Sequence, residues 1–139
     1  SEQTFLDALE EGGVEVGEYH LPDWSDRKES LLSCLDSLFK VTPPTALIIQ
    51  EATVFAAVQQ FLANRELKVP DDVSLICSDP DPNFAWCEPT IAHMTWRSRP
   101  IVRRIIRWAD KISRGKEDLV KSFANAELIE GGSLGVAKD

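Results

Sequence analysis

The sequence has no long hydrophobic run, few histidines and an odd number of cysteines. No apolar segment approaches the roughly 20 residues that a membrane-spanning helix needs. The first three residues, Ser-Glu-Gln, have neither the basic region nor the apolar core of a signal peptide. Three cysteines without framework spacing favour a reducing compartment, and two histidines far from any paired cysteines do not make a metal site. We therefore expect a cytoplasmic protein without a membrane segment, metal ion or other cofactor.

The composition is that of a folded domain with one core. Of the 139 residues, 43% are hydrophobic and 27% are charged, which suits one ordinary globular domain. The net charge of −8 argues against general affinity for nucleic acid. Basic residues nevertheless gather between positions 97 and 116. Because they lie opposite a broad apolar face in a predicted helix, we interpret them as its solvated side.

Apolar spacing in the first third of the chain predicts a helix, a short strand and a second helix. Residues 5–9 recur at helical spacing before a Gly-Gly pair, and residues 14–19 suggest a short strand. Asp26 and Glu29 have the spacing of a capping box. They precede an apolar stripe at residues 31–39, which predicts that a helix begins near them.

The remaining elements alternate between strand and helix. They are a strand at 46–49, a helix at 54–62, strands at 73–77 and 91–94, a helix at 101–112 and a strand at 123–129. The continuous apolar run at 46–49 is typical of a strand buried on both faces of a parallel sheet. We therefore expect an α/β fold with three layers, an open and mainly parallel sheet, and right-handed crossovers.

The residues that follow predicted strands are the first candidates for a site, because ligands bind beyond the carboxyl ends of open parallel sheets. They are Trp24, Gln50, Glu51, Asp79, Asp81 and Trp96. Carboxylates and amides exchange hydrogen bonds with hydroxyl groups, and indole rings stack on sugars or purines. This chemistry indicates binding more than catalysis. The alternative is that Asp79 caps the next turn and that the tryptophans are core or interface residues.

Two enzyme hypotheses also start from this region. A strand followed by Asp79 and Asp81 resembles the first motif of haloacid-dehalogenase-type phosphatases, in which one carboxylate attacks phosphorus and the other transfers protons. The lysine and paired aspartates expected further along the chain are not found, and this hypothesis stays as the enzyme alternative. Cys77 or Cys87 with His93 suggests a nucleophile and base, but Cys77 lies inside a predicted strand, where a small apolar residue is expected.

Three separate segments resemble one family of regulators, in the family's order. Residues 44–51, PTALIIQE, resemble the "PTAI" strand of the LacI/GalR transcriptional regulators. Residues 69–79, VPDDVSLICSD, resemble their "VPDDVSVVGFDD" stretch, and residues 88–94 resemble their "PPLTTV" crossover. The resemblance covers nearly the whole chain.

The resemblance implies a periplasmic-binding-protein-like effector domain, in which two α/β subdomains enclose a small molecule. On this basis residues 1–89 form the second subdomain, 90–117 are a crossover strand and helix that complete the first, and 118–139 are a return strand and tail. The implied protein is a homodimeric, cytoplasmic regulator and not an enzyme. It senses a sugar or related metabolite, and it binds operator DNA through a module outside this chain.

The resemblance also implies roles for four residues. Asp79 matches the aspartate that binds ligand hydroxyls, and Trp24 matches the aromatic residue that stacks on the ligand. Glu51 stands for the asparagine after the first motif, and Trp96 for a polar cleft residue. The departures are Ala52 for an aspartate, Pro80 for a second aspartate, Val102 for a helix glycine and Ser1 for a ligand-binding arginine.

The helix at 101–112 carries an apolar face that, by the resemblance, the rest of the first subdomain covers. Ile101, Ile105, Trp108 and Ile112 form this face. If most of the first subdomain is absent, we expect the face to lack its usual cover and to pair with another chain or an exchanged segment.

Overall fold

The computed structural model describes residues 2–137, and the chain divides after Pro44 into two units. Ser1, which stands where the family resemblance predicts a ligand-binding arginine, lies outside the described residues. None of the helices described is both long enough and apolar enough to cross a membrane.

The first unit contains α1 (Glu2–Glu11), the 3-10 helix η1 (Glu18–His20) and α2 (Lys28–Val41). The strand predicted at 14–19 is wrong, because a turn satisfies the backbone there. The Gly17 oxygen accepts a hydrogen bond from the His20 amide at 3.0 Å, and the Gly17 amide donates to the His20 ring at 3.0 Å. Groups that bond within this turn are not free for a strand ladder.

The capping box predicted at the start of α2 is also wrong. The helix begins at Lys28, so Arg27 is the N-cap residue, and no side chain caps it there. The helix begins one residue too late for Asp26 to serve as the cap. The predicted apolar stripe is confirmed by two buried residues, Leu31 and Leu35.

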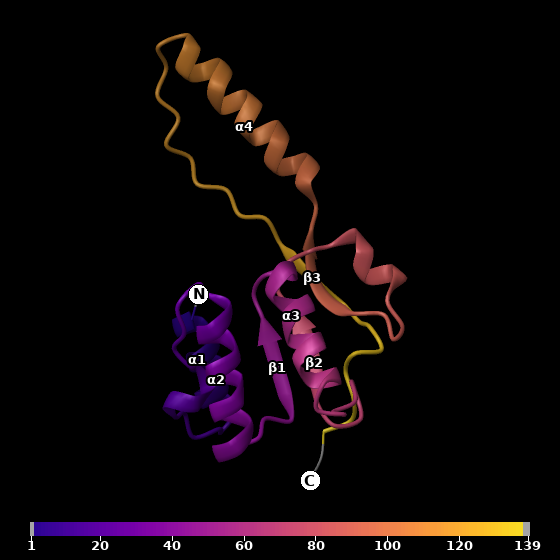
Figure 1. Cartoon of the computed structure of the whole chain (residues 1–139). Helices are drawn as coiled ribbons and strands as arrows, with labels where there is room; N and C mark the ends of the chain where they lie inside the picture. The colour runs from indigo at the N-terminus through magenta and orange to yellow at the C-terminus, as the bar shows by residue number, and fades with distance from the viewer. Residues whose placement is uncertain (1, 138–139) are drawn as a thin grey trace. The chain divides into compact units, whose positions relative to one another are not determined.

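The second unit is built on a four-stranded sheet of order β1-β2-β3-β4 (Figure 1). The strands are β1 (Ala46–Ile49), β2 (Ser74–Cys77), β3 (Ala92–Trp96) and β4 (Ala126–Ile129). The first three are parallel, and β4 runs antiparallel to β3. The α/β class and the mainly parallel sheet are therefore confirmed. The last strand starts three residues later than predicted, at Ala126.

Helix α3 (Ala52–Ala63) connects β1 to β2 and covers one face of the sheet. Its buried residues are Phe55, Val58, Phe61 and Leu62. The two-sided burial predicted for β1 is wrong: Ile49 is buried, but Ile48 is 55% exposed. Successive side chains of a strand point to opposite faces, so Ile48 and Ile49 lie on different faces of the sheet and only the Ile49 side is buried at this end of β1.

The C-terminal segment fills the space where β2 and β3 begin. The amide of Leu75 donates to the Ser133 carbonyl at 2.9 Å, and the Ser133 hydroxyl donates to the Leu75 carbonyl at 2.7 Å. The same hydroxyl accepts a hydrogen bond from the Ala92 amide at 2.8 Å. A Cβ atom at Gly131 would lie 2.5 Å from the Ala92 nitrogen, so this close approach requires glycine.

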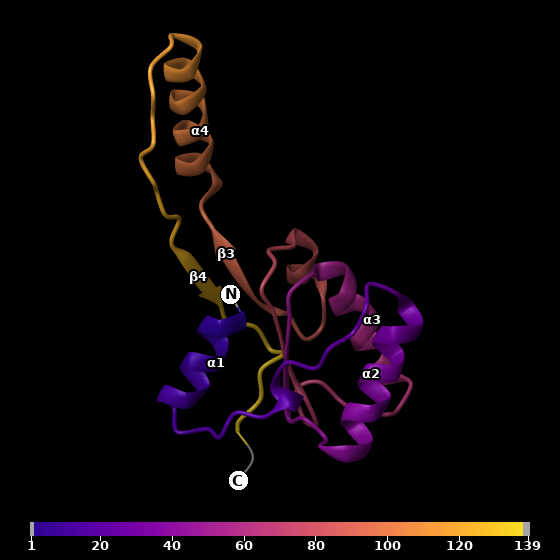
Figure 2. The ribbon, with the colours of Figure 1, turned by 90° about the vertical axis from the view of Figure 1, so that its left-hand side faces the viewer.

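Helix α4 (Ser98–Ser113) leaves the carboxyl end of β3, and the chain then returns beside it to β4 (Figures 1 and 2). We call residues 97–125 the arm. The helix begins two residues before Pro100, which therefore lies in the first turn, as the sequence predicts. No apolar residue of the arm is buried.

Candidate functional site

The carboxyl ends of β1, β2 and β3 meet at one edge of the sheet because these strands are parallel. Glu51 follows β1, Asp79 follows β2 and Trp96 ends β3. The Ser78 amide donates to the Ile49 carbonyl at 2.8 Å, which extends the pairing of β1 and β2 toward this edge. Three of the four predicted site residues therefore belong to the same edge.

Asp79 is half-buried at this edge and has no partner for its carboxylate among residues 2–137. The next turn is capped by Asp81 instead, whose Oδ1 accepts a hydrogen bond from the Asn83 amide at 2.8 Å. This turn begins the 3-10 helix η2 (Pro82–Trp86). The capping alternative considered for Asp79 thus applies to Asp81, and the Asp79 carboxylate is available to another group.

The loop after β2 is held in place by contacts between tilted rings. The buried Phe84 ring lies 5.3 Å from the Phe55 ring on α3 and 5.3 Å from the His93 ring on β3. The Ile91 amide donates to the Phe84 carbonyl at 3.3 Å. Since these contacts join α3, η2 and β3, they fix the path of the loop that carries Asp79.

The other candidates have exposed polar or aromatic surface. Glu51 is exposed and is the N-cap residue of α3, but its side chain makes no capping hydrogen bond. Trp96 is 40% exposed, so part of its indole ring is open to a ligand. Trp24 belongs to the first unit, where it is half-buried. Carboxylates accept hydrogen bonds from hydroxyl groups, and an exposed indole ring can stack on an apolar ring face.

Cys77 and His93, which lie near this edge, have structural contacts that account for their positions. Cys77 is fully buried, and this burial raises the pKa of its thiol. A protonated, enclosed thiol is a poor nucleophile. His93 packs against Phe84, and its Nδ1 lies 2.8 Å from the Ile91 carbonyl. Among the described residues, no group of three or more His, Cys, Asp or Glu side chains is placed to hold a metal ion.

The family model for the periplasmic binding protein-like domain matches residues 1–134. The chain belongs to this family. The match extends over both units and both ends of the arm.

Solved structures show the same fold as this periplasmic-binding-protein-like domain. A LacI family transcriptional regulator from Bifidobacterium animalis subsp. lactis matches with a TM-score of 0.81 and 21% identity over 99% of this chain and 50% of that one. A sugar-binding LacI family regulator from Escherichia coli, solved with phosphate, matches with a TM-score of 0.75 and 21% identity. The match covers 94% of this chain and 47% of that one. A complex of the transcriptional regulator CelR with cellobiose matches with a TM-score of 0.76 and 19% identity. The match covers 91% of this chain and 39% of that one.

The present chain thus spans about half the length of the solved structures or less. None of the curated protein sequences compared with the chain matches it. The comparisons therefore establish the family and the fold of this periplasmic-binding-protein-like domain, and the site residues rest on the geometry above.

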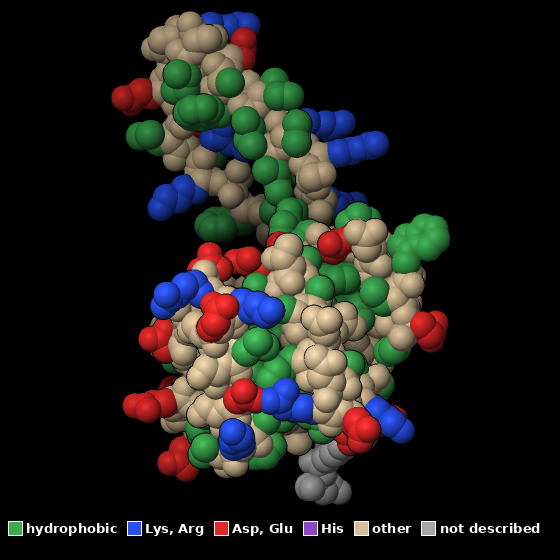
Figure 3. Space-filling model, in the orientation of Figure 1, with side chains coloured by type: hydrophobic (Ala, Val, Ile, Leu, Met, Phe, Trp, Pro, Cys, Tyr) green, Lys and Arg blue, Asp and Glu red, His purple; other side chains and the backbone are tan. Residues whose placement is uncertain are grey.

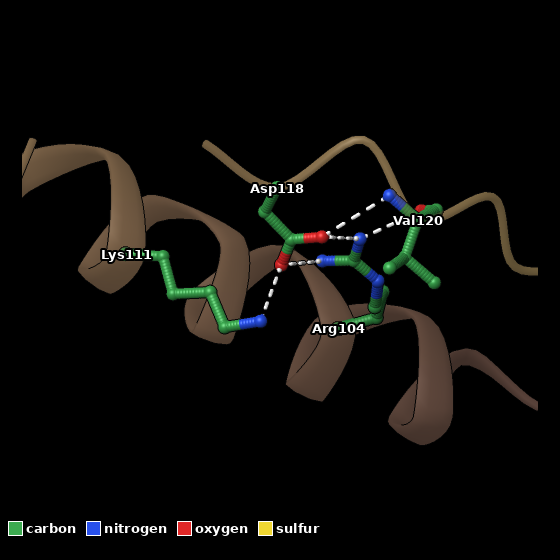
Figure 4. A network of polar contacts seen from close by, with 4 residues as sticks. All are labelled: Arg104, Lys111, Asp118 and Val120. Atoms are coloured by element: carbon green, nitrogen blue, oxygen red, sulfur yellow. Dashed lines mark hydrogen bonds and ion pairs between the residues drawn. The ribbon is translucent and has the colours of Figure 1, made fainter. Parts of the chain in front are cut away.

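The sequence analysis missed an ion-pair network in the arm (Figure 4). Arg104 donates to both carboxylate oxygens of Asp118, at 2.8 and 3.1 Å, and the Lys111 amine lies 3.0 Å from Asp118 Oδ2. The Val120 amide adds a bond at 3.2 Å, and the Asp118 side chain is only 2% exposed. The available signal was the spacing of Arg104 and Lys111, two helical turns apart on one side of α4.

This network also fixes the charge of Asp118. The hydrogen bond from Lys111, supported by the Val120 amide and the positive charge of Arg104, holds the pKa of the Asp118 carboxyl below its ordinary value. Desolvation acts in the opposite direction but is outweighed. An ionised Asp118 therefore ties the return segment to α4 at neutral pH.

Proposed function

We propose that this chain is the small-molecule-sensing part of a LacI-type transcriptional regulator. The observation that carries the proposal is the unpartnered carboxylate of Asp79 at the carboxyl edge of a parallel sheet in this family. A sugar or related polar metabolite is the proposed ligand. The sugar-binding regulator and the cellobiose complex among the solved relatives support this class.

The proposed roles follow from the chemistry of the side chains. Asp79 accepts hydrogen bonds from ligand hydroxyls, and Glu51 provides a further acceptor. Trp96 stacks on the apolar face of the ligand. For Trp24, in the first unit, the stacking role is carried over from the family resemblance alone. The chain has no role in a chemical step, and its neighbours in fold are described as transcription regulators.

At the level of the whole regulator, we assign residues 1–89 to the second effector-binding subdomain. Residues 90–117 are assigned to crossover elements of the first, and residues 118–139 to the return strand and tail. The regulator is a cytoplasmic homodimer whose operator-binding module is not part of these 139 residues. Ligand acts by binding two arrangements of the subdomains with unequal affinity, which shifts the balance between them.

A thermal-shift titration of the chain with cellobiose, monosaccharides, sugar acids, sugar phosphates and purines tests this proposal. A ligand at about 100 times its dissociation constant stabilises the folded chain by about 2.7 kcal/mol. We expect Asp79→Asn to leave folding intact and to weaken binding by about 1–3 kcal/mol, because a hydrogen bond to a charged acceptor is lost.

Asp71→Asn is the matched control, since Asp71 is exposed and precedes β2 at the opposite end of the strand. Equal losses of affinity in both variants would contradict the assignment of Asp79. Turnover of a generic phosphate ester with magnesium, lost in Asp79→Asn, would favour the phosphatase alternative instead.

A further inference from the structure

Two carboxylates stand at neighbouring strand ends on the carboxyl edge of the sheet. Ile49 of β1 is paired in register with Cys77 of β2, and Glu51 and Asp79 each follow two positions later. The backbone of Glu51 is still extended, so β1 keeps its direction up to this residue. Because neighbouring strands lie about 4.8 Å apart, one group of a ligand at this edge can reach both carboxylates.

Neither carboxylate is used by the protein itself. Asp79 has no partner among residues 2–137, and the Glu51 side chain makes no capping hydrogen bond. In a proposed site that encloses its ligand, both charges lose part of their contact with water. A desolvated charge is costly unless an opposite charge or hydrogen-bond donors compensate it. The ligand therefore has to supply this compensation, unless the rest of the protein does.

The segments that build this edge contain no Lys or Arg. Residues 41–64 run from the end of α2 through β1 and α3, and residues 69–96 run from before β2 to the end of β3. The next Lys or Arg along the chain is Arg97, which lines a hollow of the arm. Figure 3 shows further Lys and Arg side chains along the arm, which leads away from the sheet. This part of the chain thus has no Lys or Arg of its own to neutralise the two carboxylates.

The other features of the edge also favour a cation. Trp96 ends β3, the strand next to β2, and an exposed indole face attracts cations. The N-terminus of α3 would attract an anion, but Glu51 stands there as the N-cap residue. An anionic ligand would meet two carboxylates, and a neutral ligand would leave both charges uncompensated.

We infer that the ligand of this site carries an ammonium group, which binds to Glu51 and Asp79. A primary ammonium group has three N–H donors, so it can donate to both carboxylates at once in charge-assisted hydrogen bonds. Trp96 contacts the carbon skeleton beside the ammonium group. The inference rests on the proposed function, because it names the chemical class of the ligand for the same site.

Titration calorimetry with matched pairs of compounds tests the charge of the ligand. The two members of a pair share a carbon skeleton but differ in the ammonium group: glucosamine and glucose, galactosamine and galactose, putrescine and butanediol. At constant ionic strength, we expect at least one amine to bind about tenfold or more tightly than its neutral counterpart. Sugar acids should not bind, because the carboxylates repel them.

Glu51→Gln separates a specific ammonium site from general attraction to an acidic protein. We expect it to weaken binding of the amine by about tenfold or more, and binding of the neutral counterpart by less than about threefold. Glu66→Gln is the matched control, since Glu66 is exposed just beyond the other end of α3. It should leave both affinities unchanged. Glu51→Asp keeps the charge and should retain part of the amine affinity, and circular dichroism should show native helix content in all three variants.

The outcomes distinguish failure of this inference from failure of the proposed function. Binding of neutral sugars or sugar acids, with no binding of any amine, would overturn the inference and leave the proposed function standing. If no compound of any pair bound, both would be overturned. Equal losses of amine affinity in Glu51→Gln and Glu66→Gln would assign the binding to overall negative charge and would also overturn the inference.

Discussion

Helices α3 and α4 belong to the same unit and both have an apolar face, but only α3 is covered. Within 12 residues α3 buries four side chains, whereas α4 buries none in 16. The difference lies in their connections. Helix α3 joins neighbouring parallel strands and so lies on the sheet, while α4 leaves the sheet at the end of β3. An apolar stripe therefore predicts a helix and the face that needs a partner, but it does not identify that partner.

The two helices are consequently held by different forces. The α3 layer is stabilised by burial of apolar area and by close packing, which act throughout its contact with the sheet. In the arm, Arg104 and Lys111 converge on Asp118, which joins the helix to the return segment at one point. Loss of a core side chain should therefore affect the whole unit, whereas loss of this ion pair should loosen the arm alone.

The largest expected effect is that of Leu62→Ala. Leu62 is fully buried on α3, so truncation removes its transfer free energy and leaves a cavity. We expect the free energy of unfolding to fall by about 2–5 kcal/mol. Ile106→Ala on α4 is the matched control and should change it by about 0.5 kcal/mol or less. Urea unfolding followed by circular dichroism measures both, and similar losses would contradict the contrast between the helices.

A smaller effect is expected for Ser133→Ala. The Ser133 hydroxyl bridges the Leu75 carbonyl and the Ala92 amide inside the sheet, so its removal leaves two buried backbone groups without a partner. We expect a loss of about 1–3 kcal/mol in the free energy of unfolding, with faster hydrogen exchange at the Ala92 amide. Ser122→Ala, at an exposed position of the arm, should have neither effect. An unchanged Ala92 exchange rate would show that the C-terminal segment shifts to replace the hydroxyl.

The central sheet could be predicted because its strands are short apolar runs between turn residues. The runs at 46–49 and 73–77 match β1 and β2 closely. The run at 14–19 has similar alternation but forms a turn instead, because the His20 ring bonds to the Gly17 amide. Such a contact between a side chain and a nearby amide leaves no trace in hydrophobic periodicity.

The candidate site could be predicted only as a set of positions after strands. Asp79 and Asp81 both precede proline, so turn chemistry does not separate them in the sequence. In the structure Asp81 has an extended backbone and accepts a hydrogen bond from the Asn83 amide, so Asp81 is the N-cap of η2. Asp79 is left without such a partner. Likewise, the sequence shows Asp118 only as an acidic residue near several basic ones. Its ion pairs could not be predicted, because they depend on the path of the return segment, which brings Asp118 against α4.

The smallest and most local effect is expected for Asp118→Asn. The loss of negative charge removes the attraction for Arg104 and Lys111, so the return segment should open more often from α4. We expect faster exchange of the Val120 amide, which donates to Asp118, while the urea midpoint of the sheet stays nearly the same. Asp110→Asn is the control, because Asp110 pairs with Arg114 on the exposed side of the same helix.

Acidification should reproduce this change in the unmodified chain. The pKa of Asp118 is lower in the folded state than its ordinary value, so its contribution to arm stability is complete above the ordinary value and is lost as pH falls through the folded one. The arm should therefore loosen only below about pH 4, where an aspartate begins to be protonated. Val120 exchange, corrected for its intrinsic pH dependence, should rise there in the unmodified chain and stay level in Asp118→Asn. A parallel rise in both would mean that acid opens the arm through other carboxylates, and the Asp118 network would then not be what distinguishes the arm from the α3 layer.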